Sequence, residues 1–181
     1  MSAVVKACRA LREQGGDEAT ADTVEDVKAQ AELARHAFGA QFVEVRVDAD
    51  TGEVRVPRVL GVFAVGRIIN PKTARSQFLG GMTMGLSMAL HEASVMDREF
   101  GDYLNHDLAQ YHFPANADIE EIDAVWLDED DGELNPMGSK GIGEIGIVGL
   151  SWSSSSSIQM ASTSPTSALT GTWYWARSWL R

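Results

Sequence analysis

One carboxylate stands inside a run of glycines, and this pairing is the clearest chemical signal in the 181-residue sequence. The run covers residues 135–149 and holds glycines at 138, 141, 143, 146 and 149 around the single acid Glu144. Glycine permits close backbone approach, so such a loop can press against a ligand and direct one side chain at it. Burial in a pocket with little water suits a carboxyl group to act as a general base. A plain glycine-rich turn with an exposed acid is the alternative interpretation.

The same run contains a match to a nucleotide-binding motif. Residues 141–146 read Gly-Ile-Gly-Glu-Ile-Gly, which fits the G-x-G-x-x-G fingerprint. That fingerprint requires a preceding strand and an acid about 20 residues further on. Residues 135–140 predict a turn instead, and no Asp or Glu follows Glu144. The context of the motif therefore argues against a dinucleotide-binding fold, and a nucleotide-binding module is the weakest functional hypothesis.

No recognisable pattern of metal ligands occurs. The histidines lack H-E-x-x-H spacing, and the acids of 128–133 lack the ligand spacing of an EF-hand loop. We expect no metal held by protein ligands, and we interpret 128–133 as a solvated turn. The only cysteine, Cys8, cannot form an internal disulfide or hold an iron–sulfur cluster. We expect Cys8 to be a small core residue.

Composition bounds the class of protein. The net charge of -11 argues against nucleic acid and anionic membranes as partners. Hydrophobic residues make up 44% of the chain, an ordinary globular value, and no apolar run approaches the length of a membrane span. The first residues show no signal peptide. We expect a cytoplasmic protein, or a periplasmic one if a partner carries the export signal.

The N-terminal half predicts a helix and then strands. Residues 2–14 have amphipathic spacing and end at a Gly-Gly pair. The acidic stretch 17–32 predicts a loop, with helix near 28–36. Residues 41–56 predict a hairpin around the turn 48–52, and the apolar run 59–65 predicts a further strand. Together these strands predict a β-meander.

A long glycine-containing helix follows. Asn70 and Pro71 are typical of a helix start, and residues 73–93 carry apolar side chains at helical spacing. Its glycines, at 80, 81 and 85, indicate that a neighbouring element or a ligand packs very close. We interpret its methionines, at 82, 84 and 88, as gap-filling core residues. Later residues predict a hairpin over 94–104, a helical turn over 107–112 and a strand over 119–127.

The composition changes after Leu150. Residues 151–181 contain ten serines, four of the five tryptophans and no acid. They show no clear helix or strand period. We therefore divide the chain into a domain over 1–150 and a divergent tail over 151–181, of the kind that a reading-frame shift would produce.

Two motifs identify a family resemblance. Residues 66–92 and 135–146 closely resemble, in this order, the C-terminal part of the molybdopterin-binding large subunit of the xanthine dehydrogenase/aldehyde oxidase family, with bacterial aldehyde-oxidase-like members nearest. The resemblance extends over about 2–149. It implies the second molybdopterin-binding domain, an α+β unit that is incomplete at both ends. The first molybdopterin-binding domain of the family is missing from this chain.

The resemblance also implies an activity. Glu144, in a Lys-x-x-Gly-Glu motif, matches the general base of a hydroxylase that oxidises an aldehyde or N-heterocycle with water as the oxygen source. Gln77 matches a residue that hydrogen-bonds the pterin, and Gly141 and Gly143 are expected to contact the cofactor. In this family the pterin dithiolene holds molybdenum, and iron–sulfur clusters and FAD are expected on partner chains or domains. We expect this chain alone to be inactive. The alternative is a non-catalytic remnant, or an assembly partner without cofactor.

Overall fold

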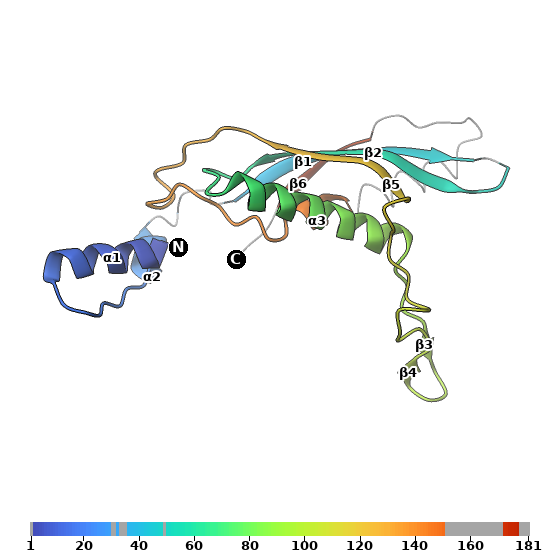
Figure 1. Ribbon diagram of the computed structural model, residues 1–181, viewed down its shortest axis with the longest axis horizontal. Helices are drawn as coiled ribbons and strands as arrows, with labels where there is room; N and C mark the ends of the chain where they lie inside the picture. Colours follow the sequence, from blue (N-terminus) through green and yellow to red (C-terminus); the bar gives the residue numbers. More distant parts are fainter. Residues whose placement is uncertain (1, 30–31, 33–35, 49, 151–171, 178–181) are drawn as a thin grey trace.

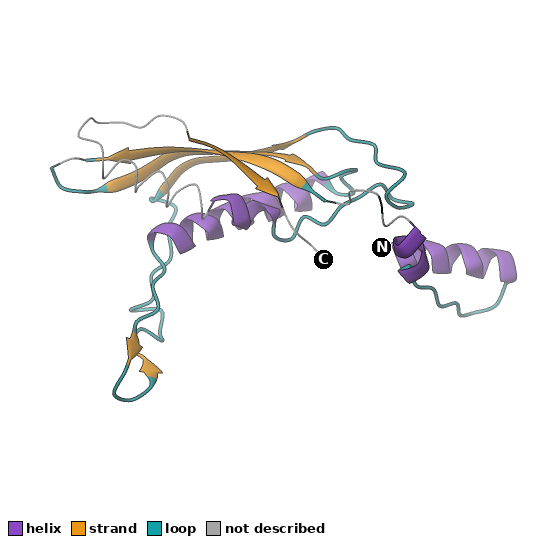
Figure 2. Cartoon of the chain, turned by 180° about the vertical axis from the view of Figure 1, so that it is seen from behind, coloured by secondary structure: helices purple, strands orange, loops and turns teal. Residues whose placement is uncertain are grey.

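The computed structural model describes residues 2–29, 32, 36–48, 50–150 and 172–177 (Figure 1). Four of its strands form one sheet in the order β5-β2-β1-β6, and a two-stranded hairpin stands apart from it. A long helix, α3, lies along one face of the sheet (Figures 1 and 2). The predicted α+β class is confirmed. The elements are α1 (Ser2–Gln14), α2 (Val24–Ala29), β1 (Phe38–Val47), β2 (Val54–Ala64), α3 (Pro71–Leu90), β3 (Met96–Asp97), β4 (Asp102–Tyr103), β5 (Ile119–Trp126) and β6 (Thr172–Arg177).

The β1–β2 hairpin forms where local turn chemistry predicts it. Asp48 Oδ1 accepts hydrogen bonds from the backbone N–H groups of Asp50 and Thr51, at 3.0 and 2.8 Å. These hydrogen bonds lower the pKa of the Asp48 carboxyl group, and the bond from the Thr51 N–H has the largest effect. Gly52 closes the turn with φ of 73°. The hairpin prediction is therefore confirmed, because short-range hydrogen bonds fix this turn.

The predicted meander is wrong. Residues 59–65 do not form a separate strand, because β2 runs without a break from Val54 to Ala64. Pro57 falls where the β1–β2 register slips: Glu44 pairs with Arg58, but Arg46 pairs with Arg55. A bulge tolerates proline, which has no N–H to donate to the ladder. The strand predicted over 119–127 does form as β5, but it pairs parallel with β2 after the crossover through α3.

The core lies between the sheet and α3. Phe63 of β2 stacks on Phe78 of α3, with ring centroids 4.3 Å apart, and Met82 and Leu86 continue the buried stripe. The predicted start of α3 is confirmed, since Asn70 Oδ1 accepts from the N–H groups of Lys72 and Thr73, at 3.1 and 3.2 Å. Of the three methionines expected in the core only Met82 is buried. Met84 and Met88 lie on the exposed side of the helix.

The N-terminal helices lie beside the sheet rather than on it (Figure 1). The helix α1 matches the predicted range, whereas α2 begins earlier than the helix expected over 28–36. Cys8 is exposed, so its assignment to the core is wrong. None of the described residues of α1 is fully buried. Among the described residues, no helix combines the length and hydropathy of a membrane span.

A hairpin arm projects from the C-terminal end of α3 (Figure 1). The strands β3 and β4 pair around Gly101, whose φ is 72°, as predicted for 94–104. The predicted turn over 107–112 is also present, with Tyr111 N–H bonded to Asp107 O at 2.9 Å. Several large apolar side chains of the arm are exposed, among them Met96, Phe100, Leu104, Leu108 and Phe113.

Only one part of the serine- and tryptophan-rich tail is described. Residues 172–177 form β6, which pairs antiparallel with β1. The sequence shows no clear strand period there, so this strand was not predicted. The remaining tail residues, 151–171 and 178–181, lie outside the described part of the chain, and the division into a domain and a divergent tail stays a prediction.

Candidate functional site

The loop before Glu144 is fixed to the end of β2. Arg67 N–H donates to Gly138 O at 2.7 Å, and Lys140 N–H donates to Val65 O at 3.0 Å. Gly66 has φ of 67°, and a Cβ on it would lie 2.2 Å from Gly138 O. Glycine at position 66 is therefore required both by its backbone conformation and by this close approach.

A buried lysine holds the acidic turn under this loop. The Lys140 side chain is only 5% exposed, and its Nζ lies 2.9 Å from Glu129 Oε1 and 3.0 Å from Asp131 Oδ2. Burial by itself would lower the pKa of Lys140, but the hydrogen bonds and charges of the two acids outweigh it and raise that pKa. Glu129 also accepts from Gly66 N–H at 2.7 Å. Glu129 and Asp131 are thus structural partners, which corrects the interpretation of 128–133 as a solvated turn at these two positions, whereas Asp128, Asp130 and Glu133 are exposed.

After Glu144 the chain turns into a helix that crosses α3 at two glycines. Residues 145–150 are helical. A Cβ on Gly81 would lie 3.0 Å from Gly146 Cα, and a Cβ on Gly146 would lie 2.9 Å from Phe78 O. The close packing predicted from the glycines of α3 is therefore present at Gly81, and the neighbour is this 145–150 helix. Gly80 is different, because no atom lies within 4 Å of where its Cβ would be.

Two glutamine side chains hold the backbone on either side of Glu144. Gln77 Nε2, on α3, donates to Gly143 O at 2.9 Å. Gln41 Nε2, on β1, donates to Ile145 O at 3.1 Å and to Gly146 O at 2.9 Å. The two predicted motifs are thus brought together directly by Gln77. The second contact was not predicted, although Gln41 is the one polar residue in phase with the inward-facing Val43 and Val45.

Glu144 directly precedes the 145–150 helix. Its carbonyl oxygen accepts from the N–H groups of Ile147 and Val148, at 3.1 and 3.3 Å. Its side chain is exposed, so the pocket with little water expected around it is not formed by the described residues. The backbone of Glu144 is therefore held in place while its carboxylate faces outward.

A cleft of about 470 Å³, here named the α3 cleft, reaches Gly143, the residue before Glu144, but Glu144 itself does not line it. Gln77 and Gly143 both line it, together with Arg67 and the first turns of α3. No atom lies within 4 Å of where a Cβ on Gly143 would be, so the glycine leaves its rim open. Residues of both sequence motifs therefore line the α3 cleft.

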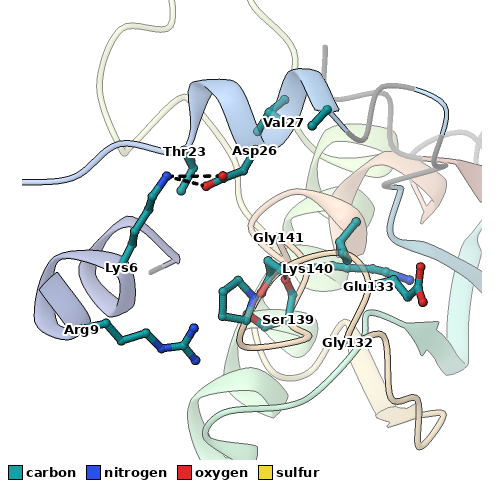
Figure 3. Close-up of a pocket in the computed structure, with 14 residues that line it drawn as sticks. Lys6, Arg9, Thr23, Asp26, Val27, Gly132, Glu133, Ser139, Lys140 and Gly141 are labelled. Carbon is teal, nitrogen blue, oxygen red and sulfur yellow. Dashed lines mark hydrogen bonds and ion pairs between the residues drawn. The ribbon is translucent and has the colours of Figure 1, made fainter. Parts of the chain in front are cut away.

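Gly141 lines a different cleft of about 750 Å³, between α1, α2 and residues 132–141 (Figure 3). Lys6 of α1 and Asp26 of α2 form an ion pair of 3.0 Å across its edge. The structure therefore does not bring Gly141 and Gly143 to one surface, although Ser139 and Lys140 line both clefts. Within the described residues no group of three or more His, Cys, Asp or Glu side chains could hold a metal ion.

Comparison with known proteins identifies the family. The model of the molybdopterin cofactor-binding domain matches residues 4–120, a range that includes Gln77 and ends before Glu144. The chain therefore belongs to the molybdopterin cofactor-binding domain family, and the family resemblance predicted from its two motifs is confirmed.

The individual relatives include a subunit that is named as molybdenum-binding. The chain is 45% identical over 137 residues to the aldehyde oxidoreductase molybdenum-binding subunit PaoC of Escherichia coli (strain K12), covering 76% of this chain and 19% of the relative. It is 31% identical over 113 residues to the 6-hydroxypseudooxynicotine dehydrogenase complex subunit gamma of Paenarthrobacter nicotinovorans, covering 62% and 14%. The chain thus spans about a fifth of the length of the curated relatives that it matches.

Solved structures agree with the fold. CO dehydrogenase from Oligotropha carboxidovorans superposes with a TM-score of 0.62 at 26% identity, covering 69% of this chain and 16% of that one. Aldehyde oxidoreductase from Desulfovibrio desulfuricans ATCC 27774 gives a TM-score of 0.57 at 21% identity, covering 85% and 19%. The second likeness concerns the fold alone.

The residues of the α3 cleft fit a pterin cofactor that bears phosphate. Gln77 uses one amide hydrogen on Gly143 O, which leaves its other amide hydrogen and Oε1 for a ligand. Arg67 is exposed at the same cleft and offers a guanidinium group, which binds phosphate through paired hydrogen bonds. Groups of this chemistry are able to hydrogen-bond a cofactor without supplying ligands to its metal.

Proposed function

We propose that this chain forms one wall of the cofactor site of a molybdenum hydroxylase, with Glu144 as its general base. The observation that carries this proposal is the hydrogen bond from Gln77 to Gly143, because it joins the cofactor-binding motif to the residue before Glu144. The substrate class we propose is an aldehyde or an N-heterocycle. Both are supported by relatives, namely an aldehyde oxidoreductase subunit and a structure of quinoline 2-oxidoreductase.

Each residue has a separate task in this proposal. The bound cofactor would supply the two-electron oxidation of the substrate, with water as the source of oxygen. Gln77 and Gly143 bind and orient the cofactor through the amide and the backbone, whereas Gly141 lines the other cleft and takes no part in this contact. Glu144 accepts the proton from the oxygen nucleophile, which is a general-base role typically worth about 10²- to 10⁴-fold in rate.

The exposed carboxylate indicates what the rest of the enzyme must add. A general base works best where water is excluded, and Glu144 is exposed in the described chain. We infer that the first molybdopterin-binding domain covers it, since the matched PaoC subunit is about four times as long as this chain. Iron–sulfur clusters and FAD on partner chains or domains would carry the electrons away, because a single cysteine cannot hold a cluster here.

The test is the Glu144→Gln substitution in the assembled enzyme that contains this chain. We expect turnover to fall by about 10²-fold or more, because glutamine cannot accept the proton, while molybdenum per enzyme stays unchanged. Glu99→Gln, at an exposed acid of the hairpin arm, is the matched control and should leave both quantities unchanged. Parallel loss of molybdenum and activity would instead make Glu144 a structural residue. A native complex without molybdenum would favour the non-catalytic alternative.

A further inference from the structure

The sheet contains one fully buried glutamine in an otherwise apolar row. Gln41 is 0% exposed and lies in β1 between other inward-facing residues, Gly39 and Val43. Its Oε1 makes no hydrogen bond to any described residue. Such an atom normally destabilises a folded protein, and an apolar residue of similar size would fill the same space without it. The presence of glutamine here calls for a functional reason.

Both hydrogen bonds of Gln41 end on one short segment. Its Nε2 donates to Ile145 O at 3.1 Å and to Gly146 O at 2.9 Å, so the amide holds the two residues that directly follow Glu144. The backbone carbonyl of Glu144 is itself bonded within the 145–150 helix. A shift of Ile145 and Gly146 would therefore move the Glu144 backbone with them.

The opposite side of the segment is held separately. Gly146 is in contact with Gly81 of α3, and Gln77 of α3 holds Gly143. Glu144 is thus the residue between two anchors, one on α3 and one on β1. The Glu144 side chain therefore starts from a fixed backbone position, although none of the described residues buries its carboxylate.

We propose that Gln41 is a positioning residue for Glu144, acting through the carbonyl groups of Ile145 and Gly146. This inference rests on the proposed general-base function. Gln41 does not touch substrate or cofactor; it sets the direction in which the base points. Misplacement of a reacting group by about 1 Å can reduce a rate about 100-fold, so a buried amide remote from the chemistry can control turnover.

The test compares Gln41→Met with Val43→Ala in the assembled enzyme. Methionine keeps the length and burial of glutamine but cannot donate, whereas Val43→Ala disturbs the same inward face of β1 without removing a hydrogen bond. We measure hydrogen exchange of the peptide covering 143–150, kcat, KM and molybdenum content. For Gln41→Met we expect exchange about tenfold faster than in Val43→Ala, kcat lower by about 10- to 100-fold, and unchanged KM and molybdenum.

Each other outcome has a defined meaning. If Gln41→Met matches Val43→Ala in exchange and kcat while Glu144→Gln is inactive, Gln41 is only a packed polar residue and the inference is overturned. Molybdenum lost in proportion to activity would also overturn it, because Gln41 would then support cofactor retention. Full activity of Glu144→Gln would overturn the general-base assignment itself, and the exchange measurement would still decide whether Gln41 holds the loop.

Discussion

Gln77 Nε2 donates to Gly143 O at 2.9 Å, and these two residues, one from each motif, lie 66 positions apart in the sequence. The contact lies at the α3 cleft, where the amide of one motif meets the glycine loop of the other. The loop is therefore positioned by α3 on the side before Glu144 and by β1 on the side after it. The site therefore requires that the glycine loop stays packed against α3.

The close packing of Gly81 against Gly146 predicts that alanine has opposite effects on stability at positions 80 and 81. Gly81→Ala should destabilise the chain by about 1–2 kcal/mol, because its Cβ would lie 3.0 Å from backbone atoms of Gly146 that cannot rotate away. Gly80→Ala should stabilise it by about 0.5–1 kcal/mol, since no atom crowds that position and alanine favours helix. Urea unfolding of both variants measures the difference. Equal effects would show that the helices do not cross at Gly81.

The buried lysine predicts a loss of stability with a defined pH dependence. Lys140→Met leaves Glu129 and Asp131 without their cation and should cost about 3 kcal/mol at pH 7. Because the folded-state pKa of Lys140 is raised, its stabilisation is fully present below the ordinary lysine pKa of about 10.4 and disappears as pH rises through the raised value. On the alkaline side, the difference in unfolding free energy between wild type and variant should therefore shrink as the pH rises above ~10.

An exposed ion pair provides the control for Lys140. Lys28 lies 2.7 Å from Glu25, but its side chain is 67% exposed. Lys28→Met should change the unfolding free energy by less than about 0.5 kcal/mol, because solvent screens such a pair. A Lys140→Met effect as small as this would mean that the acidic turn does not depend on Lys140.

Local signals explain which elements the sequence predicts correctly. The turn at Asp48, the cap at Asn70 and the hairpin at Gly101 are each fixed by contacts within a few residues, so residue type alone identifies them. The parallel pairing of β2 with β5 depends on a crossover through α3, which no local pattern specifies. Pro57 even indicates a false strand boundary, because the bulge that accommodates it is a property of the pair of strands.

The residues of the candidate site likewise differ in whether the sequence predicts them. Gln77 and Glu144 stand in motifs that the sequence reveals, whereas Gln41 acts on residues 104 and 105 positions away. A polar residue in phase with Val43 and Val45 was the available signal for it. The exposure of Cys8 could not be predicted either, because amphipathic spacing shows that a helix has an apolar face but not that a core covers it.

The cap of α3 predicts a stability change near the cleft. Asn70→Ala removes the acceptor for the N–H groups of Lys72 and Thr73 and should cost about 1 kcal/mol. Asn70→Asp keeps an acceptor at this position and should retain most of the stability. Thermal unfolding of the two variants separates the lost cap from a general effect of substitution. If alanine and aspartate behave alike, the capping bonds do not stabilise α3.

Gln77 predicts coupled effects on the loop and on the cofactor. Gln77→Met removes the donor to Gly143 O and the amide that faces the α3 cleft. We expect about tenfold weaker retention of molybdenum, the equivalent of one hydrogen bond of about 1.4 kcal/mol, with faster hydrogen exchange of residues 143–150. Ser76→Ala, at the neighbouring exposed position of the same turn, is the control and should change neither quantity. Faster exchange with unchanged molybdenum would restrict Gln77 to holding the loop, and unchanged exchange with lost molybdenum would restrict it to the cofactor.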